Sequence, residues 1–127
     1  MKFKAICENH LYSKAYSKGK RALTSALAVY VLHDYQAKRL AKAHPEGVMM
    51  NRIGLTVSTK LGGAVVRSRV RRILRAALQL LEREKDLKRG FLIVICARGA
   101  AVKLKSTDIK RQLDSAFEKL GMYRESL

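Results

Sequence analysis

The sequence predicts a single domain of the α+β class. With 127 residues, of which 48% are hydrophobic, the chain can build one packed core but not two. Apolar residues recur with helical spacing in some segments and alternate with strand spacing in others. Because helical and extended segments are interspersed and no internal repeat is found, we expect one mixed domain over residues 1–127.

The first half of the chain predicts a helix and two strands. Residues 9–18 have helical spacing and end at Gly19. Residues 23–33 and 51–59 alternate in the manner of strands, and residues 34–50 between them are interpreted as a mobile connection or insertion. The side chains expected in the core are Leu11, Ala15, Leu27, Val29, Val31, Ile53, Leu55 and Val57.

The two predicted strands also present a second face. In the second strand this face is small and polar, so we expect no helix to cover it. If the two strands pair with these faces aligned, Tyr30 stands among small side chains in a shallow open groove. The residues of the small face are Arg52, Gly54, Thr56 and Ser58.

The second half predicts a long helix, a strand and a final helix. Residues 64–86 place their apolar side chains within an arc of about 120°. Residues 91–97 are apolar on both faces, which indicates a central strand. Residues 107–120 form the last helix. The core positions expected in the two helices are Val66, Val70, Ile73, Leu74, Ala77, Leu80, Leu81, Ile109, Leu113, Ala116, Phe117 and Leu120.

The chain is strongly basic, with a formal net charge of +17 at pH 7 and an isoelectric point near 10.4. This charge on a short folded chain favours RNA, DNA or an anionic membrane surface as the partner. The longest apolar run, residues 91–97, is too short to span a membrane, and the N-terminus lacks the apolar stretch of a signal peptide. We therefore expect a cytoplasmic nucleic-acid-binding protein with no membrane role.

The positive charge is concentrated on the long predicted helix. Five arginines stand between residues 67 and 75, and no carboxylate occurs from Gly47 to Leu81. A helix face that serves only solubility usually mixes both signs. Unpaired arginines repel one another unless a polyanion neutralises them, and their planar guanidinium groups hold phosphate bidentately or stack on bases. The pattern predicts a nucleic-acid-binding helix but does not distinguish RNA from DNA.

Three tyrosines form a second candidate site. Tyr12 and Tyr16 are one helical turn apart, and Tyr30 lies on the second face of the first predicted strand. Tyrosines in such positions often pack at the edge of a core with a hydrated hydroxyl group. They also serve as stacking platforms for single-stranded nucleic acid in a basic groove. The residues alone leave both interpretations open.

The sequence shows no catalytic constellation. Neither the three histidines nor the two cysteines have metal-ligand spacing. We expect Cys7 and Cys96 to be reduced thiols. Gly62 and Gly63 complete no glycine-rich nucleotide-binding motif and are interpreted as a flexible entry to the next helix. No catalytic and no metal-ligating side chain is therefore predicted.

Residues 52–75 resemble the central signature of the bacterial ribonuclease P protein subunit family. That family typically has a strand ending in Ser-Lys-Lys, then Gly-Asn-Ala-Val, then an Arg-Asn-Arg helix with further basic positions. Here the stretch runs through Lys60, Gly62-Gly63-Ala64-Val65 and Arg67-Ser68-Arg69. Tyr12, Tyr16 and Gly19 also resemble the aromatic-x-x-x-aromatic-x-x-Gly pattern of the family's first helix, and Tyr30 matches an aromatic residue of its next long strand.

The resemblance implies an α-β-β-β-α-β-α sandwich with a four-stranded sheet and a left-handed βαβ crossover, against the usual right-handed rule. It also implies an endoribonuclease in which a large RNA subunit performs the chemistry. That chemistry is the metal-dependent removal of the 5′ leader from precursor tRNA, with Mg²⁺ held mainly by the RNA. The implied partners are ribonuclease P RNA and precursor tRNA, with no obligate protein partner.

The resemblance further implies two binding sites on the protein. Ser68 and Gly63 stand where the family has asparagines, and they remove an amide donor and acceptor from each position. The residues implied to bind the catalytic RNA are Lys60, Arg67, Ser68, Arg69, Arg71, Arg72 and Arg75, and those implied to bind the leader are Tyr12, Tyr16, Tyr30 and Arg52.

Other functions fit parts of the pattern. A basic ribosome-associated or RNA-chaperone domain with no processing role has the same charge distribution. A DNA-binding regulator is weakened by the lack of a helix-turn-helix pairing or a dimerisation stripe. An autonomous protein nuclease is disfavoured because no carboxylate cluster with metal-binding spacing occurs.

Overall fold

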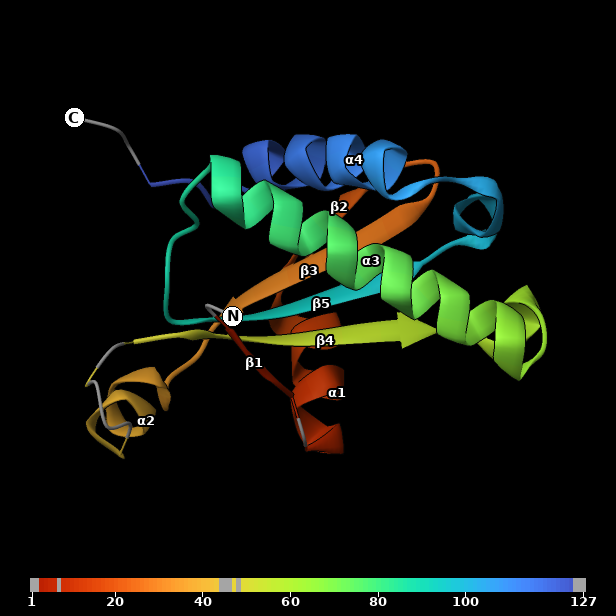
Figure 1. Ribbon diagram of the computed structural model, residues 1–127. Coiled ribbons are helices and arrows are strands. Elements are labelled where there is room, and N and C mark those ends of the chain that lie inside the picture. The colour runs from red at the N-terminus through yellow and green to blue at the C-terminus, as the bar shows by residue number, and fades with distance from the viewer. Residues whose placement is uncertain (1–2, 7, 44–46, 48, 125–127) are drawn as a thin grey trace.

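The computed structural model describes residues 3–6, 8–43, 47 and 49–124. It is an α+β fold in which helices pack on both faces of one sheet (Figure 1). The elements are β1 (Phe3–Ala5), α1 (Asn9–Lys18), β2 (Lys20–Leu23), β3 (Leu27–His33), α2 (Ala37–Ala43), β4 (Asn51–Val57), the 3₁₀ turn η1 (Thr59–Leu61), α3 (Ala64–Glu84), β5 (Phe91–Ala97), the 3₁₀ turn η2 (Gly99–Lys103) and α4 (Ser106–Lys119).

The sheet has five strands in the order β1-β4-β5-β3-β2. Strands β2, β3, β4 and β5 are the four that the family resemblance implies, and β1 adds a fifth at the edge through parallel pairing with β4. Strand β5 is central, as its apolar sequence predicts, because it pairs antiparallel with β3 and parallel with β4.

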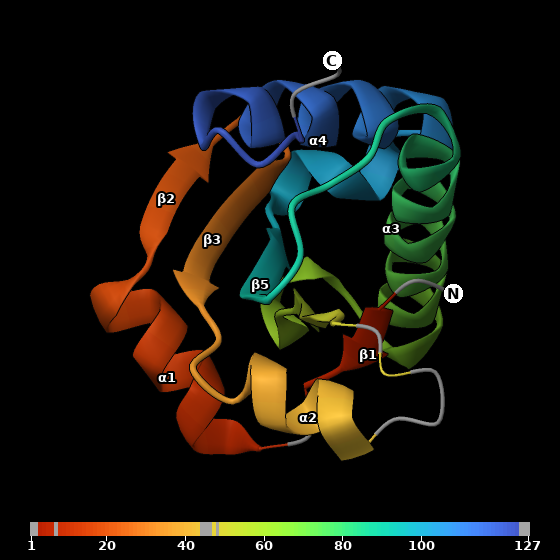
Figure 2. The same cartoon turned by 90° about the vertical axis from the view of Figure 1, so that its left-hand side faces the viewer.

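The unit β4-α3-β5 makes the left-handed crossover. Its two strands are parallel neighbours, so α3 must carry the chain back along the sheet between them. In Figure 1 both strands run from left to right, α3 lies in front of the sheet and β5 lies above β4, which is the left-handed arrangement. Figure 2 confirms that α3 and α4 lie on the same side of the sheet.

The main core lies between the sheet and the helices α3 and α4. Phe117, Leu113 and Ile109 of α4 are fully buried against α3 and the strands. On α3 the predicted apolar arc is correct at most positions, but Leu78 is fully buried and Leu80 only half-buried. The buried stripe of α3 is therefore rotated slightly toward Leu78 from the arc that the sequence predicts.

A second, smaller core lies on the opposite face of the sheet. There Leu11 and Ala15 of α1 pack against Leu92 and Val94 of β5. The expectation that no helix covers this face is therefore wrong. The physical reason is that β5 places its large apolar side chains beside the small residues of β4, and α1 buries them.

The sequence predicts a single strand over residues 23–33, but this range contains the last residue of β2, a turn and the whole of β3. Strands β2 and β3 pair antiparallel and form a hairpin. Its turn is closed by a hydrogen bond from the Thr24 amide to the Leu27 carbonyl (2.8 Å). Gln112 of α4 also fixes this turn, because its side-chain oxygen accepts from the Ala26 amide (2.9 Å) and the Thr24 hydroxyl (2.5 Å). The condition of direct pairing between the two predicted strands is not met, since β5 lies between β3 and β4.

The sequence predicts a mobile connection over residues 34–50, but the described part of this segment contains the helix α2. The Asp34 carboxylate accepts a hydrogen bond from the Gln36 amide (3.1 Å), and its carbonyl accepts from the Ala37 amide (3.0 Å). Asp34 thus forms the turn that leads into α2, with the side-chain bond of an Asx turn. Residues 44–46 and 48 of this segment lie outside the described residues.

Candidate nucleic-acid interface

The first candidate surface covers η1 and the N-terminal half of α3, and we call it the arginine face. Ser58 accepts a hydrogen bond from the Lys60 amide (3.2 Å) and starts η1. Gly62 then turns the chain with φ of +147°, and Gly63 is the N-cap of α3. The arginine face consists of Lys60, Arg67, Ser68, Arg69, Arg71, Arg72 and Arg75.

No cation of the arginine face forms an ion pair with a carboxylate of the described residues. Every ion pair formed between described residues lies elsewhere in the fold. Arg69 donates to the Val102 carbonyl (2.9 Å), which fixes η2 against α3. Arg67 is half-buried, and its Nε has no hydrogen-bond partner among the residues that the structure describes. The remaining arginines of this face, Arg71, Arg72 and Arg75, are exposed to solvent.

The second candidate surface is formed by Tyr12, Tyr16 and Tyr30, and we call it the tyrosine surface. Tyr16 meets Tyr30 edge to face, with ring centroids 5.0 Å apart and an interplanar angle of 82°. The ring of Tyr12 lies directly over Gly54, where an added Cβ would overlap the ring. Sheet register explains the grouping, because Tyr30 and Gly54 both stand opposite Val94 of β5. The structure therefore brings together three tyrosines that the sequence places on two elements.

Tyr16 is the most exposed of these tyrosines, with 44% of its surface accessible. Its hydroxyl group lies 3.5 Å from the Cys96 sulfur. Burial of the hydroxyl end and the contact with Cys96 raise the pKa of Tyr16 to about 12, although a hydrogen bond with Thr56 acts in the opposite direction. The phenol is therefore neutral near pH 7, so it brings no negative charge toward a bound polyanion.

Arg21 joins the tyrosine surface, and sequence reasoning missed it. It pairs with Tyr30 in the β2–β3 ladder and is exposed, while Ala22 beside it points into the main core. Side chains of directly paired residues lie on the same face of a sheet. The sequence signal for Arg21 is that residues 20–23 form a strand in which Ala22 is buried and its neighbours are exposed. A predicted strand that begins at Leu23 does not include this segment.

Arg52 has a different environment from the one expected. Its Nε and Nη2 donate to the two carboxylate oxygens of Asp34 at 2.7 and 2.9 Å. The Arg52 side chain is only 11% exposed, and that of Asp34 is 3% exposed. The structure therefore does not bring the Arg52 guanidinium to the exposed part of the tyrosine surface. It joins β4 to the start of α2 instead.

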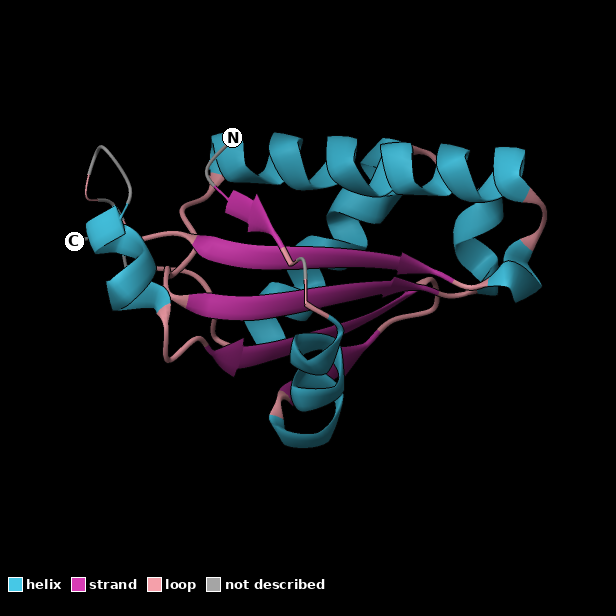
Figure 3. Ribbon diagram, turned by 90° about the horizontal axis from the view of Figure 1, so that it is seen from below, coloured by secondary structure: helices cyan, strands magenta, loops and turns pink. Residues whose placement is uncertain are grey.

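The two candidate surfaces lie on opposite faces of the sheet. Helix α3 packs on the face that holds the main core, and α1 packs on the face that holds the smaller one. Seen from below, α1 projects from the side of the sheet that α3 does not cover (Figure 3). A ligand on the arginine face and a ligand on the tyrosine surface can therefore be bound at the same time.

We searched the described residues for metal-ligand clusters, membrane-spanning helices and pockets. These residues contain no group of three or more histidine, cysteine, aspartate or glutamate side chains that could hold a metal ion. None of the helices within the described ranges is long and apolar enough to cross a membrane. An open pocket of about 450 Å³ lies between the β2–β3 turn and α4, and no residue of the two candidate surfaces lines it.

Comparison with known proteins agrees with this geometry. The family model for ribonuclease P matches residues 1–121. The chain is 34% identical over 122 residues to the ribonuclease P protein component of Clostridium acetobutylicum, covering 96% of this chain and 92% of that one. It is 31% identical over 119 residues to the corresponding component of Bacillus velezensis, covering 94% and 90% of the two chains.

Solved structures share the fold. The Staphylococcus aureus RNase P protein superposes with a TM-score of 0.74 at 21% identity, covering 94% of this chain and 97% of that chain. The Thermotoga maritima RNase P protein gives a TM-score of 0.63 at 17% identity, with coverages of 82% and 86%. Matched along nearly its whole length in sequence and in fold, the chain belongs to the family of ribonuclease P protein components, which act in tRNA processing.

Proposed function

We propose that this protein binds the catalytic RNA of ribonuclease P through the arginine face and the 5′ leader of precursor tRNA through the tyrosine surface. In this proposal the RNA subunit performs the hydrolysis that removes the leader, and the RNA holds the Mg²⁺ that the reaction needs. The protein contributes binding energy and orientation. It works in the cytoplasm with these two RNAs and needs no other protein.

One observation carries the proposal: the unpaired arginines and the grouped tyrosines are separated by the thickness of the sheet. Phosphate-rich, structured RNA is bound largely by cations, and each neutralised phosphate makes binding more sensitive to salt. Single-stranded RNA is bound by stacking of its bases on aromatic rings beside a basic groove. The two surfaces thus have the two chemistries that a catalytic RNA and a single-stranded leader require.

On the tyrosine surface, the exposed Tyr16 ring offers a stacking face and the adjacent Tyr30 holds it edge-on. Arg21 supplies a cation at the same face. Arg52 is given a positioning role in place of a direct contact with the leader, because its guanidinium is engaged by Asp34. The leader-binding set that we propose is therefore Tyr12, Tyr16, Tyr30 and Arg21.

Reconstitution tests the proposal. The purified protein is combined with a bacterial ribonuclease P RNA and precursor tRNA at low Mg²⁺ concentration, and cleavage at the mature 5′ end is measured. We expect cleavage to be stimulated by the protein and to require the RNA. Absence of stimulation, with both RNAs shown to be intact, would contradict the proposal.

Further outcomes separate the other functions. Cleavage by the protein without the RNA would indicate a protein nuclease. Binding of structured RNA with no stimulation of cleavage would indicate a ribosome-associated or RNA-chaperone domain. Tyr30→Ala adds a finer test, because it should weaken affinity for leader-bearing substrate by about 1–3 kcal/mol and leave affinity for mature tRNA unchanged.

A further inference from the structure

The helix α2 is a basic element that neither candidate surface uses. Its sequence contains three cations and no carboxylate. Lys38, Arg39 and Lys42 are all exposed, and at about 100° per residue they share one side of the helix. The other side carries Ala37, which is buried, and Leu40, which is half-buried. A short helix with this arrangement presents its charge outward from a fixed apolar base.

The base of α2 is firmly attached to the rest of the fold. Asp34 starts the helix and is held by the buried, bidentate ion pair with Arg52 of β4. Its amide also donates to the Gly90 carbonyl (2.9 Å), which joins the start of α2 to the beginning of β5. The cations of α2 are therefore displayed from a defined position, and a ligand that binds them does not have to order the helix first.

An exposed aromatic ring stands beside these cations. Tyr35 lies two residues before α2, and 82% of its surface is accessible. The ammonium group of Lys14 lies over this ring, 5.7 Å from its centroid, and links α1 to the start of α2. Most of the ring surface is therefore open to a ligand. Tyr35 and the four cations form a set that we call the α2 patch: Lys14, Tyr35, Lys38, Arg39 and Lys42.

The α2 patch borders the tyrosine surface but is separate from it. On α1, Lys14 lies on the flank opposite Tyr12 and Tyr16, and the buried Leu11 and Ala15 lie between these flanks at about 100° per residue. In Figure 1 both α1 and α2 lie below the sheet, whereas α3 lies in front of it and α4 above. RNA held along the arginine face is thus on the other side of the molecule.

We propose that the α2 patch is a second binding site for single-stranded RNA, occupied by leader nucleotides upstream of those on the tyrosine surface. This inference rests on the proposed function, since it extends the path of the same substrate across α1. Tyr35 stacks on a base, and the cations neutralise neighbouring phosphates. Only precursors whose leader is long enough to pass α1 reach the site.

The test uses the reconstituted ribonucleoprotein with two precursor tRNAs that differ only in leader length, one of a few nucleotides and one several times longer. Substrate dissociation constants are measured for the unaltered protein, for Tyr35→Ala and for the triple variant K38Q/R39Q/K42Q. We expect Tyr35→Ala to weaken binding of the long-leader substrate by about 5- to 100-fold and to leave the short-leader substrate unchanged. The triple variant should also reduce the salt slope for the long leader by about 0.7 for each phosphate that the protein no longer neutralises.

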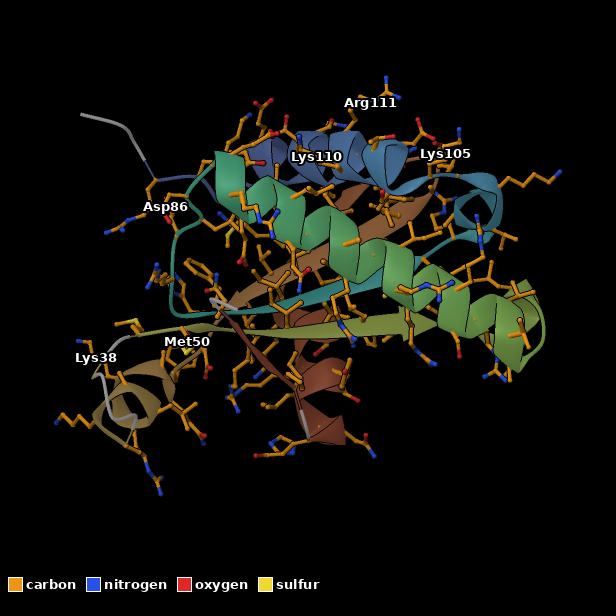
Figure 4. The ribbon with its side chains drawn as sticks, in the orientation of Figure 1. Lys38, Met50, Asp86, Lys105, Lys110 and Arg111 are labelled. Carbon is orange, nitrogen blue, oxygen red and sulfur yellow. The ribbon has the colours of Figure 1, made fainter. Side chains whose placement is uncertain are left out.

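A matched control variant removes three positive charges from a surface distant from α2. Lys103, Lys105 and Lys119 are exposed and lie on η2 and α4 or between them. Figure 4 places Lys105 near α4 and Lys38 on α2 at the opposite end of the molecule. The variant K103Q/K105Q/K119Q should therefore bind both substrates alike. If it weakened the long-leader complex as much as the α2 variant does, a general charge effect would replace the proposed site.

Three results would overturn the inference. These are equal losses for both leader lengths, a loss of affinity for the RNA subunit alone, or no loss with Tyr35→Ala and the triple variant. Tyr30→Ala, measured with the short leader, reports on the proposed function separately. If Tyr30→Ala weakens binding and the α2 variants do not, only the further inference fails.

Discussion

Gly54 shows how a single hydrogen atom in place of a side chain shapes the tyrosine surface. The ring of Tyr12 occupies the space that a Cβ at this position would need. The nearest atoms belong to the far end of the Tyr12 side chain, which can rotate away at small cost to the fold. Glycine is thus required here for the position of a ring, not for an unusual backbone angle.

We predict that Gly54→Ala displaces Tyr12 and weakens binding of leader-bearing precursor tRNA by about 1–3 kcal/mol if a base stacks on that ring. Equilibrium binding to the reconstituted ribonucleoprotein checks this, with mature tRNA as the reference ligand. Gly99→Ala is the control, because a Cβ there meets no atom within 4 Å. Adding Gly54→Ala to Tyr12→Ala should cause no further loss, and an additive loss would contradict the explanation.

Arg52 illustrates why a side chain's partner decides its role. A buried charge is stable only when it is paired and hydrogen-bonded, and Asp34 satisfies Arg52 at two atoms. The same carboxylate begins α2. One ion pair therefore links β4 with the helix that carries the α2 patch.

At the scale of elements, the entry to α3 combines two glycines with different requirements. Gly62 has φ of +147°, and a Cβ there would lie 3.0 Å from the Val66 side chain. Gly63 is extended, serves as the N-cap without a side-chain hydrogen bond, and has open space around it. Only at Gly62 does the backbone conformation require a glycine. Gly63 leaves the first-turn amides of α3 without the cap that an asparagine provides.

We predict that Gly63→Asn raises the free energy of unfolding by a few tenths of a kcal/mol, because asparagine caps a helix slightly better than glycine. Gly62→Ala should lower it by more than about 1 kcal/mol, because alanine is strained at that angle. Urea unfolding with an unchanged m-value measures both. Equal effects of the two substitutions would show that the turn does not have the geometry described.

At the scale of the whole molecule, the sheet separates the arginine face from the tyrosine surface. We predict that Arg71→Gln with Arg75→Gln weakens assembly with the RNA subunit and lowers the salt slope by about 0.9 for each phosphate left without its cation. Tyr30→Ala should instead weaken leader binding. Because the two surfaces lie on opposite faces of the sheet, the loss in each binding free energy should be the same in the combined variant as in the separate variants, to within about 0.5 kcal/mol. A larger coupling would mean that one RNA contacts both surfaces.

The sequence by itself determined those elements whose apolar pattern is strong and local. The periodicity of α3 and the doubly apolar sequence of β5 were correctly predicted, because each depends on residues close together in the chain. The signature around Lys60 and Arg69 likewise identified the family, which the comparisons confirm.

Only the tertiary structure decided how distant segments meet. In the folded chain β5 lies between β3 and β4, and α1 packs on the second face of the sheet. Arg52 pairs with Asp34, and Arg21 lies opposite Tyr30. Strand order and register depend on which apolar faces can be buried together, and that is a property of the whole chain. For the same reason, a segment with the composition of a loop became the anchored helix α2, which carries the second RNA site that we propose.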